Sequence, residues 1–390
     1  MFKFIPVAYI FMNFWIVWWF WRMLRGSRWV RPVVCLLFIG WAASFPLLYR
    51  NGDASVLQVW LLRIGGFWLA AFIYLFVAVF ILDIVGLCRK IWGKKPAGYI
   101  PHRPVRPRYK TSLSVVTLVA VIVAASWWNA VSPQLREINL TVEVADPAAL
   151  GLKNNTLTIA AVSDIHLGRS ISAHRLERML SLLKPYTLDA VFFVGDLIDD
   201  PLILDTDILR SSITALDVRS GVWAVMGNHE YVWDINTSIQ IMEDSGIRVL
   251  RDQWAVLDDA ILVVGRDDFS KQRFIGEPRA DLEDILSTIP SQYRALPLIL
   301  LDHQPHHLET AQKAGAILQL SGHTHNGQIF PFNFIGALLY ENQFGLSQRG
   351  LTHYYVSAGA GTWGPPVRNT ARPEVVLVRI QFVSSPSSAR

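Results

Sequence analysis

The sequence contains very little cysteine. Its 390 residues include two, Cys35 and Cys88, and both lie in long apolar stretches. The rest of the chain therefore has neither a disulfide framework nor a cysteine-based structural zinc site. Internal repeats and low-complexity tracts are also missing. In contrast, apolar residues make up 52% of the chain and tryptophan occurs 15 times, both high for a soluble protein.

Acidic residues are scarce in the first part of the chain. Residues 1–110 contain fifteen Lys and Arg but only Asp53 and Asp83 as acids, a formal charge of +13. The remainder carries 21 basic and 29 acidic residues, a formal charge of −8. The positive charge lies between apolar stretches, which is typical of a membrane segment and excludes a nucleic-acid binder with a basic face.

Charged residues are almost missing from four apolar runs, at residues 4–21, 33–49, 64–88 and 111–135. About 20 apolar residues cross a bilayer, and a buried helix of a soluble protein would normally show a polar stripe. The runs therefore predict four transmembrane helices. The first run lacks a small-residue cleavage site and leads directly into an arginine cluster, so we do not interpret it as a signal peptide. Asp83 is the one acid within a run, and we expect it near a helix end or paired with a basic loop residue.

The connections between these runs differ in their content of basic residues. The first and third are rich in them, with Arg22, Arg25, Arg28 and Arg31 in the first and Arg89, Lys90, Lys94, Lys95, Arg103, Arg106, Arg108 and Lys110 in the third. The second has only Arg50 and Arg63. Because basic connections stay in the cytoplasm, four spans place the rest of the chain on the extracytoplasmic side of the plasma or inner membrane. If one of the four runs does not span, that part of the chain moves to the cytoplasm.

The sequence after about residue 140 alternates between short β-rich apolar runs and amphipathic stretches. The predicted strands are residues 156–162, 190–194, 222–226, 261–264, 298–301, 316–320, 354–356 and 375–380. The predicted helices are residues 172–184, 205–216, 236–244, 281–289 and 305–314. This alternation predicts an α/β domain whose strands are buried on both faces.

Metal-ligating side chains follow five of these strands. The turns read SDIHLG at 163–168, GDLIDD at 195–200, GNHE at 227–230, DHQPHH at 302–307 and SGHTH at 321–325, and they hold seven of the ten histidines. Ligands bind at the carboxyl ends of the strands in open α/β sheets, so these groups should converge. Carboxylate, amide and imidazole groups without a thiolate suit two divalent ions such as Mn, Fe or Zn. A glycine precedes Asp196, Asn228 and His323, which allows close approach.

These five blocks, in this order, resemble the calcineurin-like metallophosphoesterase superfamily, which includes the purple acid phosphatases. Its motifs are D-x-H, G-D-x-x-D, G-N-H-[DE], H and G-H-x-H. With its apolar first part, and with GHTHNGQIFP, YYVSAGAG and PPVRNTARPEVVLV, the chain looks like the membrane-anchored branch, the transmembrane proteins with a metallophosphoesterase domain. The resemblance implies a four-layer αββα sandwich over residues 136–390, preceded by a bundle of four transmembrane helices over residues 1–135. Asn326 stands where that branch has glycine.

The resemblance also implies roles for single residues. Asp164, His166 and His325 would hold one metal ion, Asn228, His303 and His323 a second, and Asp196 would bridge the two. A metal-bound hydroxide would then attack phosphorus. His229 would stabilise the phosphoryl oxygens or protonate the leaving group, with a structural hydrogen bond as the alternative, and Asp199 would orient a metal-binding histidine.

Other polar residues near these motifs are open to two interpretations. Arg368 is a candidate for binding a phosphate, or a plain surface arginine, and Asn326 is a candidate at the rim of the substrate site. Asp302, His306 and His307 are expected to support the ligands or to lie on a helix surface. The apolar segment IFPFNFIGALLY, residues 329–340, is expected to form a buried hairpin, with contact to the bilayer or to an acyl chain as the alternative.

The sequence thus predicts a membrane-anchored hydrolase of phosphodiester, phosphomonoester or pyrophosphate bonds. A lipid substrate is suggested by the tether alone, since a tethered site meets membrane substrates at high effective concentration. The alternatives are a cytoplasm-facing nucleotide or lipid pyrophosphatase and a catalytically inactive membrane sensor. The sequence does not predict the oligomeric state.

Overall fold

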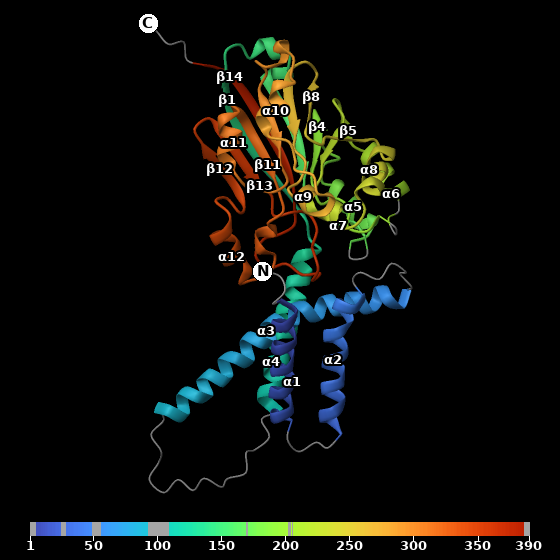
Figure 1. The fold of residues 1–390 in the computed structure, drawn as a ribbon, viewed down its shortest axis with the longest axis vertical. Coiled ribbons are helices and arrows are strands. Elements are labelled where there is room, and N and C mark those ends of the chain that lie inside the picture. The colour runs from blue at the N-terminus through green and yellow to red at the C-terminus, as the bar shows by residue number, and fades with distance from the viewer. Residues whose placement is uncertain are drawn as a thin grey trace. The chain divides into compact units, whose positions relative to one another are not determined.

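The chain divides into two compact units. The computed structural model describes residues 5–24, 29–48, 56–92, 109–168, 171–201, 204 and 206–385. One unit comprises Met1–Trp128 with Gly364–Val367, and the other Asn129–Trp363 with Arg368–Arg390. The helices of the first unit and the sheets of the second can be followed in Figure 1. The described residues do not include several of the basic residues on which the predicted orientation depends, among them Arg25, Arg28 and those within residues 94–108.

The first unit is made of long helices, α1 (Ile5–Met23), α2 (Val30–Leu48), α3 (Val56–Trp92) and α4 (Tyr109–Ala130). Three stretches among the described residues, Val30–Leu48, Leu57–Trp92 and Lys110–Ala130, are long and apolar enough to cross a membrane. Helix α1 also has 19 residues but includes Asn13, Arg22 and four tryptophans, which lower its mean hydropathy. The first of the four predicted spans therefore stays a prediction.

In the helical unit, Asp83 has a basic partner and the last helix ends earlier than the sequence predicts. Asp83 pairs with Arg22 at 3.1 Å, so its partner comes from the end of α1. The fourth predicted run, residues 111–135, is helical only as far as Ala130, and strand β1 already begins at Gln134. Pro133 accounts for this difference, because the residue before a proline is driven out of the helical conformation.

The second unit contains two six-stranded sheets. In the first sheet the order is β1 (Gln134–Val144), β14 (Glu374–Ser384), β2 (Thr156–Val162), β4 (Ala190–Val194), β6 (Val222–Val225) and β7 (Ile247–Val249). In the second it is β12 (Gly345–Arg349), β13 (Thr352–Val356), β11 (Ala316–Ser321), β10 (Leu298–Leu301), β9 (Ile261–Gly265) and β8 (Gln253–Leu257). A small sheet pairs β3 (Thr187–Leu188) with β5 (Asp217–Val218).

The central strands of both sheets run parallel to their neighbours. Strands β2, β4, β6 and β7 are parallel to one another, and so are β9, β10, β11 and β13. Within each sheet the carboxyl ends of these strands therefore meet at one edge. Strand β14 is antiparallel to β2 but parallel to β1, and the strands β12 and β8 are antiparallel to their neighbours β13 and β9.

Helices cover the outer faces of the two sheets (Figure 1). Among the described residues, the α-helices of this unit are α5 (Ala173–Leu180), α6 (Thr206–Thr214), α7 (Asn228–Val232), α8 (Ile235–Asp244), α9 (Ser270–Ile275), α10 (Leu282–Ser287), α11 (Leu308–Lys313) and α12 (Phe332–Leu339), the last of which lies beyond the strand ends. Leu176 of α5 and Leu209 of α6 pack into a core with the first sheet, and Leu282 of α10 and Leu308 of α11 pack into one with the second. A third core, with Phe192 and Ile299, includes side chains of both sheets. The layers are thus helix, sheet, sheet and helix.

All eight predicted strands of the second unit are present, and the mixed α/β prediction is confirmed. The predicted helix at residues 305–314 begins only at Leu308, because His307 has a positive φ of 54° and turns the chain before the first helical residue. The predicted helix at residues 172–184 ends at Leu180.

The prediction of a buried hairpin at residues 329–340 is wrong. Residues Phe332–Leu339 form helix α12, which lies beyond the strand ends below β12 and β13 in Figure 1. Ile329 is buried, but Phe330, Phe334, Leu338 and their apolar neighbours are exposed. Apolar composition alone therefore did not predict burial here.

Candidate metal centre

The five predicted turns lie at the carboxyl ends of parallel strands. Asp164 and His166 follow β2, Asp196 and Asp199 follow β4, and Asn228 and His229 follow β6 in the first sheet. His303 follows β10, and His323 and His325 follow β11 in the second. Two hydrogen bonds join the sheets at this edge: the Nδ1 of His303 to the carbonyl of Val194 at 2.7 Å, and the backbone N–H of His323 to the carboxylate of Asp164 at 3.0 Å.

The structure brings six of the seven predicted ligands, all except Asn228, into close groups. Ligand atoms of Asp164, His166 and His325 lie within 4.8 Å of one another, and so do those of Asp196, His303 and His323. A further group consists of His166, Asp199 and His229. Asp196 lies between the first two groups, because its Oδ2 is 3.2 Å from Nε2 of His303 and 4.0 Å from Nε2 of His166.

The donor atoms of these groups fit divalent cations. The Nδ1 atoms of His166 and His303 are directed at Asp199 and at the carbonyl of Val194, so each Nε2 is left as the ligand atom. The Nε2 of His303 and the Oδ1 of Asn228 are buried and have no hydrogen-bond partner. Buried polar atoms are rarely left unpaired, and an oxygen and nitrogen donor set without thiolate is typical of Mn, Fe and Zn sites.

The backbone at these positions is unusual. Five of the seven predicted ligands have a positive φ: Asp164 (52°), His166 (56°), Asp196 (51°), His323 (70°) and His325 (49°). Residues other than glycine adopt such angles rarely, and they cluster at functional sites.

The glycines before Asp196, Asn228 and His323 have no room for a side chain, and a Cβ on Gly195 would collide with the side chain of His303. A Cβ on Gly227 would collide with the carboxylate of Asp196, and one on Gly322 with Ser163 and the carboxylate of Asp164. The close approach that the sequence predicted for these three glycines is therefore present.

Burial and mutual charge shift the pKa values of the clustered groups in opposite directions. Burial lowers the pKa of His323 to about 3 and that of His325 well below its usual value, and the nearby imidazoles of His303 and His166 add to these effects. Burial raises the pKa of Asp164. Burial opposes ionisation of Asp196 too, but the positive charges of His303 and His229 hold the pKa of that carboxyl well below its usual value. Neutral imidazole and ionised carboxylate are the forms that bind metals.

His229 lies beside the ligand groups and shares a carboxylate with one of them. Its Nδ1 is 2.6 Å from Oδ1 of Asp199, a contact without the alignment of a hydrogen bond, and the same oxygen lies 2.9 Å from Nδ1 of His166. The backbone N–H of His229 donates to Asp196 at 2.8 Å, and its ring packs on that of Trp363 with centroids 5.8 Å apart. Burial would lower the pKa of His229, but the charges of Asp196 and Asp199 raise it to about 9.

Glu230 is a residue to which the sequence gave no role. Its buried carboxylate accepts hydrogen bonds from the backbone N–H groups of Asp196 (3.2 Å), Ile198 (3.0 Å) and Gly227 (2.9 Å). It therefore joins the turn after β4 to the turn after β6. Burial and the charge of Asp196 raise its pKa to about 7. The signal was present in GNHE, where a carboxylate follows two residues after a predicted ligand.

The structure does not present Arg368 to a phosphate. The side chain is fully buried, and its guanidinium donates to the carbonyls of Ala358, Gly359, Gly361 and His325. It thus holds the turns around the centre. The arginine is therefore neither the phosphate-binding residue nor the surface residue that the sequence suggested. The sequence shows that an arginine follows a strand, but it does not show which hydrogen-bond acceptors surround the side chain.

The remaining candidates lie around the two ligand groups. Asn326 donates to the carbonyl of Thr370 at 3.2 Å and accepts from Gln343 at 2.9 Å. Asp302 is buried between Arg266 and Arg279. His306 stacks near Tyr340, with ring centroids 5.0 Å apart, and His307 is exposed.

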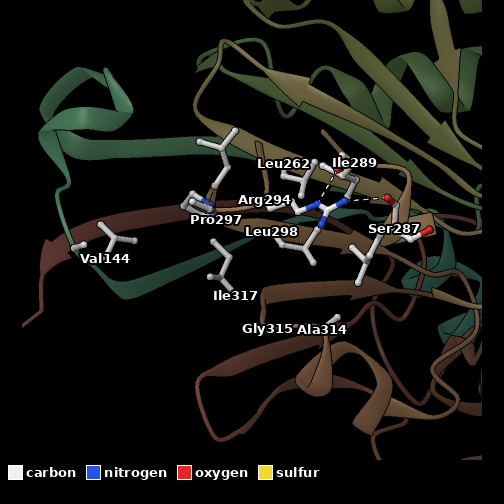
Figure 2. A pocket seen from close by; sticks show the side chains of 14 residues that line it. Val144, Leu262, Ser287, Ile289, Arg294, Pro297, Leu298, Ala314, Gly315 and Ile317 are labelled. Carbon is white, nitrogen blue, oxygen red and sulfur yellow. Dashed lines mark hydrogen bonds between the residues drawn. The ribbon is translucent and has the colours of Figure 1, made fainter. Parts of the chain in front are cut away.

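A hollow of about 640 Å³ lies at the opposite sheet edge. Figure 2 shows its lining, which includes Leu262, Leu298 and Ile317 at the amino ends of their strands. The guanidinium of Arg294 donates to the carbonyls of Ile289 and Ser287 at the end of α10, so its charge already has partners. This hollow does not include any of the predicted ligands.

The part of the chain that carries the candidate metal centre is similar to known proteins. The family described as calcineurin-like phosphoesterase matches residues 157–327, which include all seven predicted ligands. An uncharacterized metallophosphoesterase of Aquifex aeolicus is 31% identical over 234 residues, covering 59% of this chain and 87% of the relative. The chain therefore belongs to the calcineurin-like phosphoesterase family.

Two further relatives extend the similarity toward the apolar part of the chain. An uncharacterized metallophosphoesterase of Campylobacter jejuni is 29% identical over 354 residues, covering 90% of this chain and 88% of the relative. A protein of Danio rerio named transmembrane protein with metallophosphoesterase domain is 29% identical over 286 residues, covering 69% and 62%. Relatives named as transmembrane proteins and three apolar helices together indicate a membrane protein.

Proposed function

We propose that the chain is a membrane-anchored phosphoester hydrolase that uses two divalent cations. The observation that carries this proposal is the position of Asp196 between two separate ligand groups. Asp164, His166 and His325 would hold one cation, Asn228, His303 and His323 the other, and Asp196 would contact both. Two such ions supply a nucleophile at neutral pH and stabilise charge on the phosphoryl oxygens.

His229 is the residue that we assign to catalysis. It is close to both ligand groups but is not needed as a ligand, and Asp199 fixes its Nδ1 side. Its Nε2 is then available to a phosphoryl oxygen or to the leaving group. Because one oxygen of Asp199 contacts both His166 and His229, the ligand and the catalytic imidazole are oriented together.

We also propose how the chain is anchored in the membrane and which class of substrate it hydrolyses. We propose four spans, with α1 as the first, over residues 1–135, and a catalytic domain over residues 136–390 on the extracytoplasmic side. The basic residues of the first and third connections support this orientation. Phosphodiesters, phosphomonoesters or pyrophosphates are the substrates, and a tethered site favours those carried by lipids.

The test compares metal content and turnover of bis-p-nitrophenyl phosphate in the purified full chain. Asp196→Asn is expected to lose metal and activity together, because the shared ligand is weakened. His229→Ala is expected to keep its metal and to lose about 100-fold or more in kcat, the usual contribution of a general acid or electrostatic group.

A matched control is His174→Ala, since His174 is exposed on α5 and should behave as the native chain. The proposal fails if both Asp196→Asn and His229→Ala hydrolyse the ester at the native rate. Loss of metal in His229→Ala would move that residue from catalysis to ligation.

A further inference from the structure

Helix α12 carries an apolar surface that the second unit leaves exposed. The side chains of Leu338, Leu339 and Phe334 are 87%, 68% and 60% exposed, and Phe330, Phe332 and Ile335 add to them. From Ala314 to Tyr340 the sequence has no Lys, Arg, Asp or Glu. A contiguous apolar patch of this kind marks a surface that contacts a partner or a membrane.

Both ends of the helix lie near residues of the candidate metal centre. It follows the turn His325–Gly327, and the backbone N–H of Phe330 donates to the side chain of Asn369 at 2.8 Å. At its other end the ring of Tyr340 lies 6.2 Å from that of His323. A contact made by α12 is therefore made at the edge where the ligands converge.

The chain enters the second unit at the same edge. Asn129, in the last turn of α4, donates to the carbonyls of Arg368 and Ala371 at 3.1 and 3.2 Å. The guanidinium of Arg368 in turn donates to the carbonyl of His325, the first residue of the turn before α12. Since α4 is one of the helices that can cross a membrane, this edge is the part of the unit that follows directly on a span.

We propose that α12 inserts its apolar side chains into the interfacial layer of the bilayer that holds the spans. The inference rests on the proposed membrane anchoring. Apolar and aromatic side chains without charge suit a bilayer interface, and the covalent link to α4 supplies the bilayer as the nearby partner. The metal centre is then held at the level of lipid headgroups, which makes lipid phosphoesters the accessible substrate class.

The experiment measures bilayer contact at single positions of the full chain. Cys35 and Cys88 are replaced by serine, and a cysteine introduced by Leu338→Cys or by Leu351→Cys is labelled with a nitrobenzoxadiazole fluorophore. Leu351 is the matched control: it is also 87% exposed, but it lies in the β12–β13 turn at the opposite strand ends. The chains are reconstituted into phosphatidylcholine vesicles with nitroxide-labelled lipid in both leaflets, so that orientation in the vesicle does not matter.

Nitroxide lipid is expected to quench the label at position 338 by about twofold or more, because an interfacial helix lies about 5–10 Å into the headgroup boundary. The label at position 351 is expected to stay unquenched. Equal quenching at both positions, or none at position 338, overturns the proposal. Protection of position 338 from iodide without lipid quenching assigns the surface to a second copy of the chain and also overturns it. The readout does not depend on catalysis, so an inactive chain that is quenched at position 338 argues only against the hydrolase.

Discussion

Removal of the Glu230 carboxylate should destabilise the second unit and the centre together. This side chain is fully buried, and it accepts three backbone hydrogen bonds from two turns that carry predicted ligands. In Glu230→Ala the N–H groups of Asp196, Ile198 and Gly227 lose their acceptor. The turn that positions Asp196 then loses two of its hydrogen bonds to α7.

The size of the effect follows from these bonds. A hydrogen bond contributes about 0.5–1.5 kcal/mol, or about 1.5–3 kcal/mol when the acceptor is charged, and a buried donor left unpaired costs about 1–3 kcal/mol. Because neighbouring effects do not add fully, we expect Glu230→Ala to lower the free energy of unfolding by about 3 kcal/mol or more. Glu230→Gln should lose about 1–3 kcal/mol, since its oxygen can accept from Asp196 and Gly227 while its amide N–H₂ faces the donor of Ile198.

Pulse proteolysis of the full chain in urea measures this difference, because eleven of the 15 tryptophans lie in residues 1–128 and would dominate fluorescence. With a slope of about 3 kcal/mol per molar urea for a unit of this size, the midpoint of Glu230→Ala should fall by about 1 M. Glu243→Ala, at an exposed position of α8, is the control and should change the free energy by less than about 0.5 kcal/mol. An unchanged midpoint for Glu230→Ala, or a larger loss for Gln than for Ala, would refute the reasoning.

Two other predictions concern the centre and the membrane. Gly322→Ala should lower the bound metal at least about tenfold, because the new Cβ collides with Ser163 and Asp164 and misplaced ligands cost about 10–100-fold in affinity. The control is Gly315→Ala, which has open space around its Cβ and should keep its metal while losing about 1 kcal/mol of stability. Equal metal content in both variants would contradict the steric argument. With four spans, alkaline phosphatase fused after Arg390 should be active and green fluorescent protein at the same position dark, whereas the reverse pattern would place the catalytic domain in the cytoplasm.

The order of the soluble elements could be predicted from the sequence because strand periodicity and turn residues act locally. Strands β2, β4 and β10 have the predicted bounds. Strand β1 was missed, since Gln134–Val144 follows directly on an apolar run that obscures its alternation. Sheet membership could not be predicted either: β14, the last strand, lies between β1 and β2, and such long-range pairing has no local signal.

The candidate ligands could be found because each follows a strand, whereas the contacts that support them depend on the folded chain. Arg368 illustrates this point: its segment resembled a phosphate-binding turn, but four carbonyls from the turns after β11 and β13 surround the guanidinium. The apolar run at α12 was misjudged for a different reason. Hydropathy measures transfer from water and is the same for a side chain that enters a protein core as for one that enters a bilayer.

The residue types of the motifs are determined by two requirements at once. Five predicted ligands have a positive φ, a conformation that costs about 1–3 kcal/mol for most residues but is adopted more readily by Asn, Asp and His, whose short polar side chains bond locally. These same side chains are the ones that bind divalent cations. A cation that binds only the folded arrangement recovers part of the cost of the turns and of the buried carboxylates. An alanine at any of these positions would remove a donor atom and also make the turn less favourable, which explains why aspartate and histidine concentrate at the strand ends.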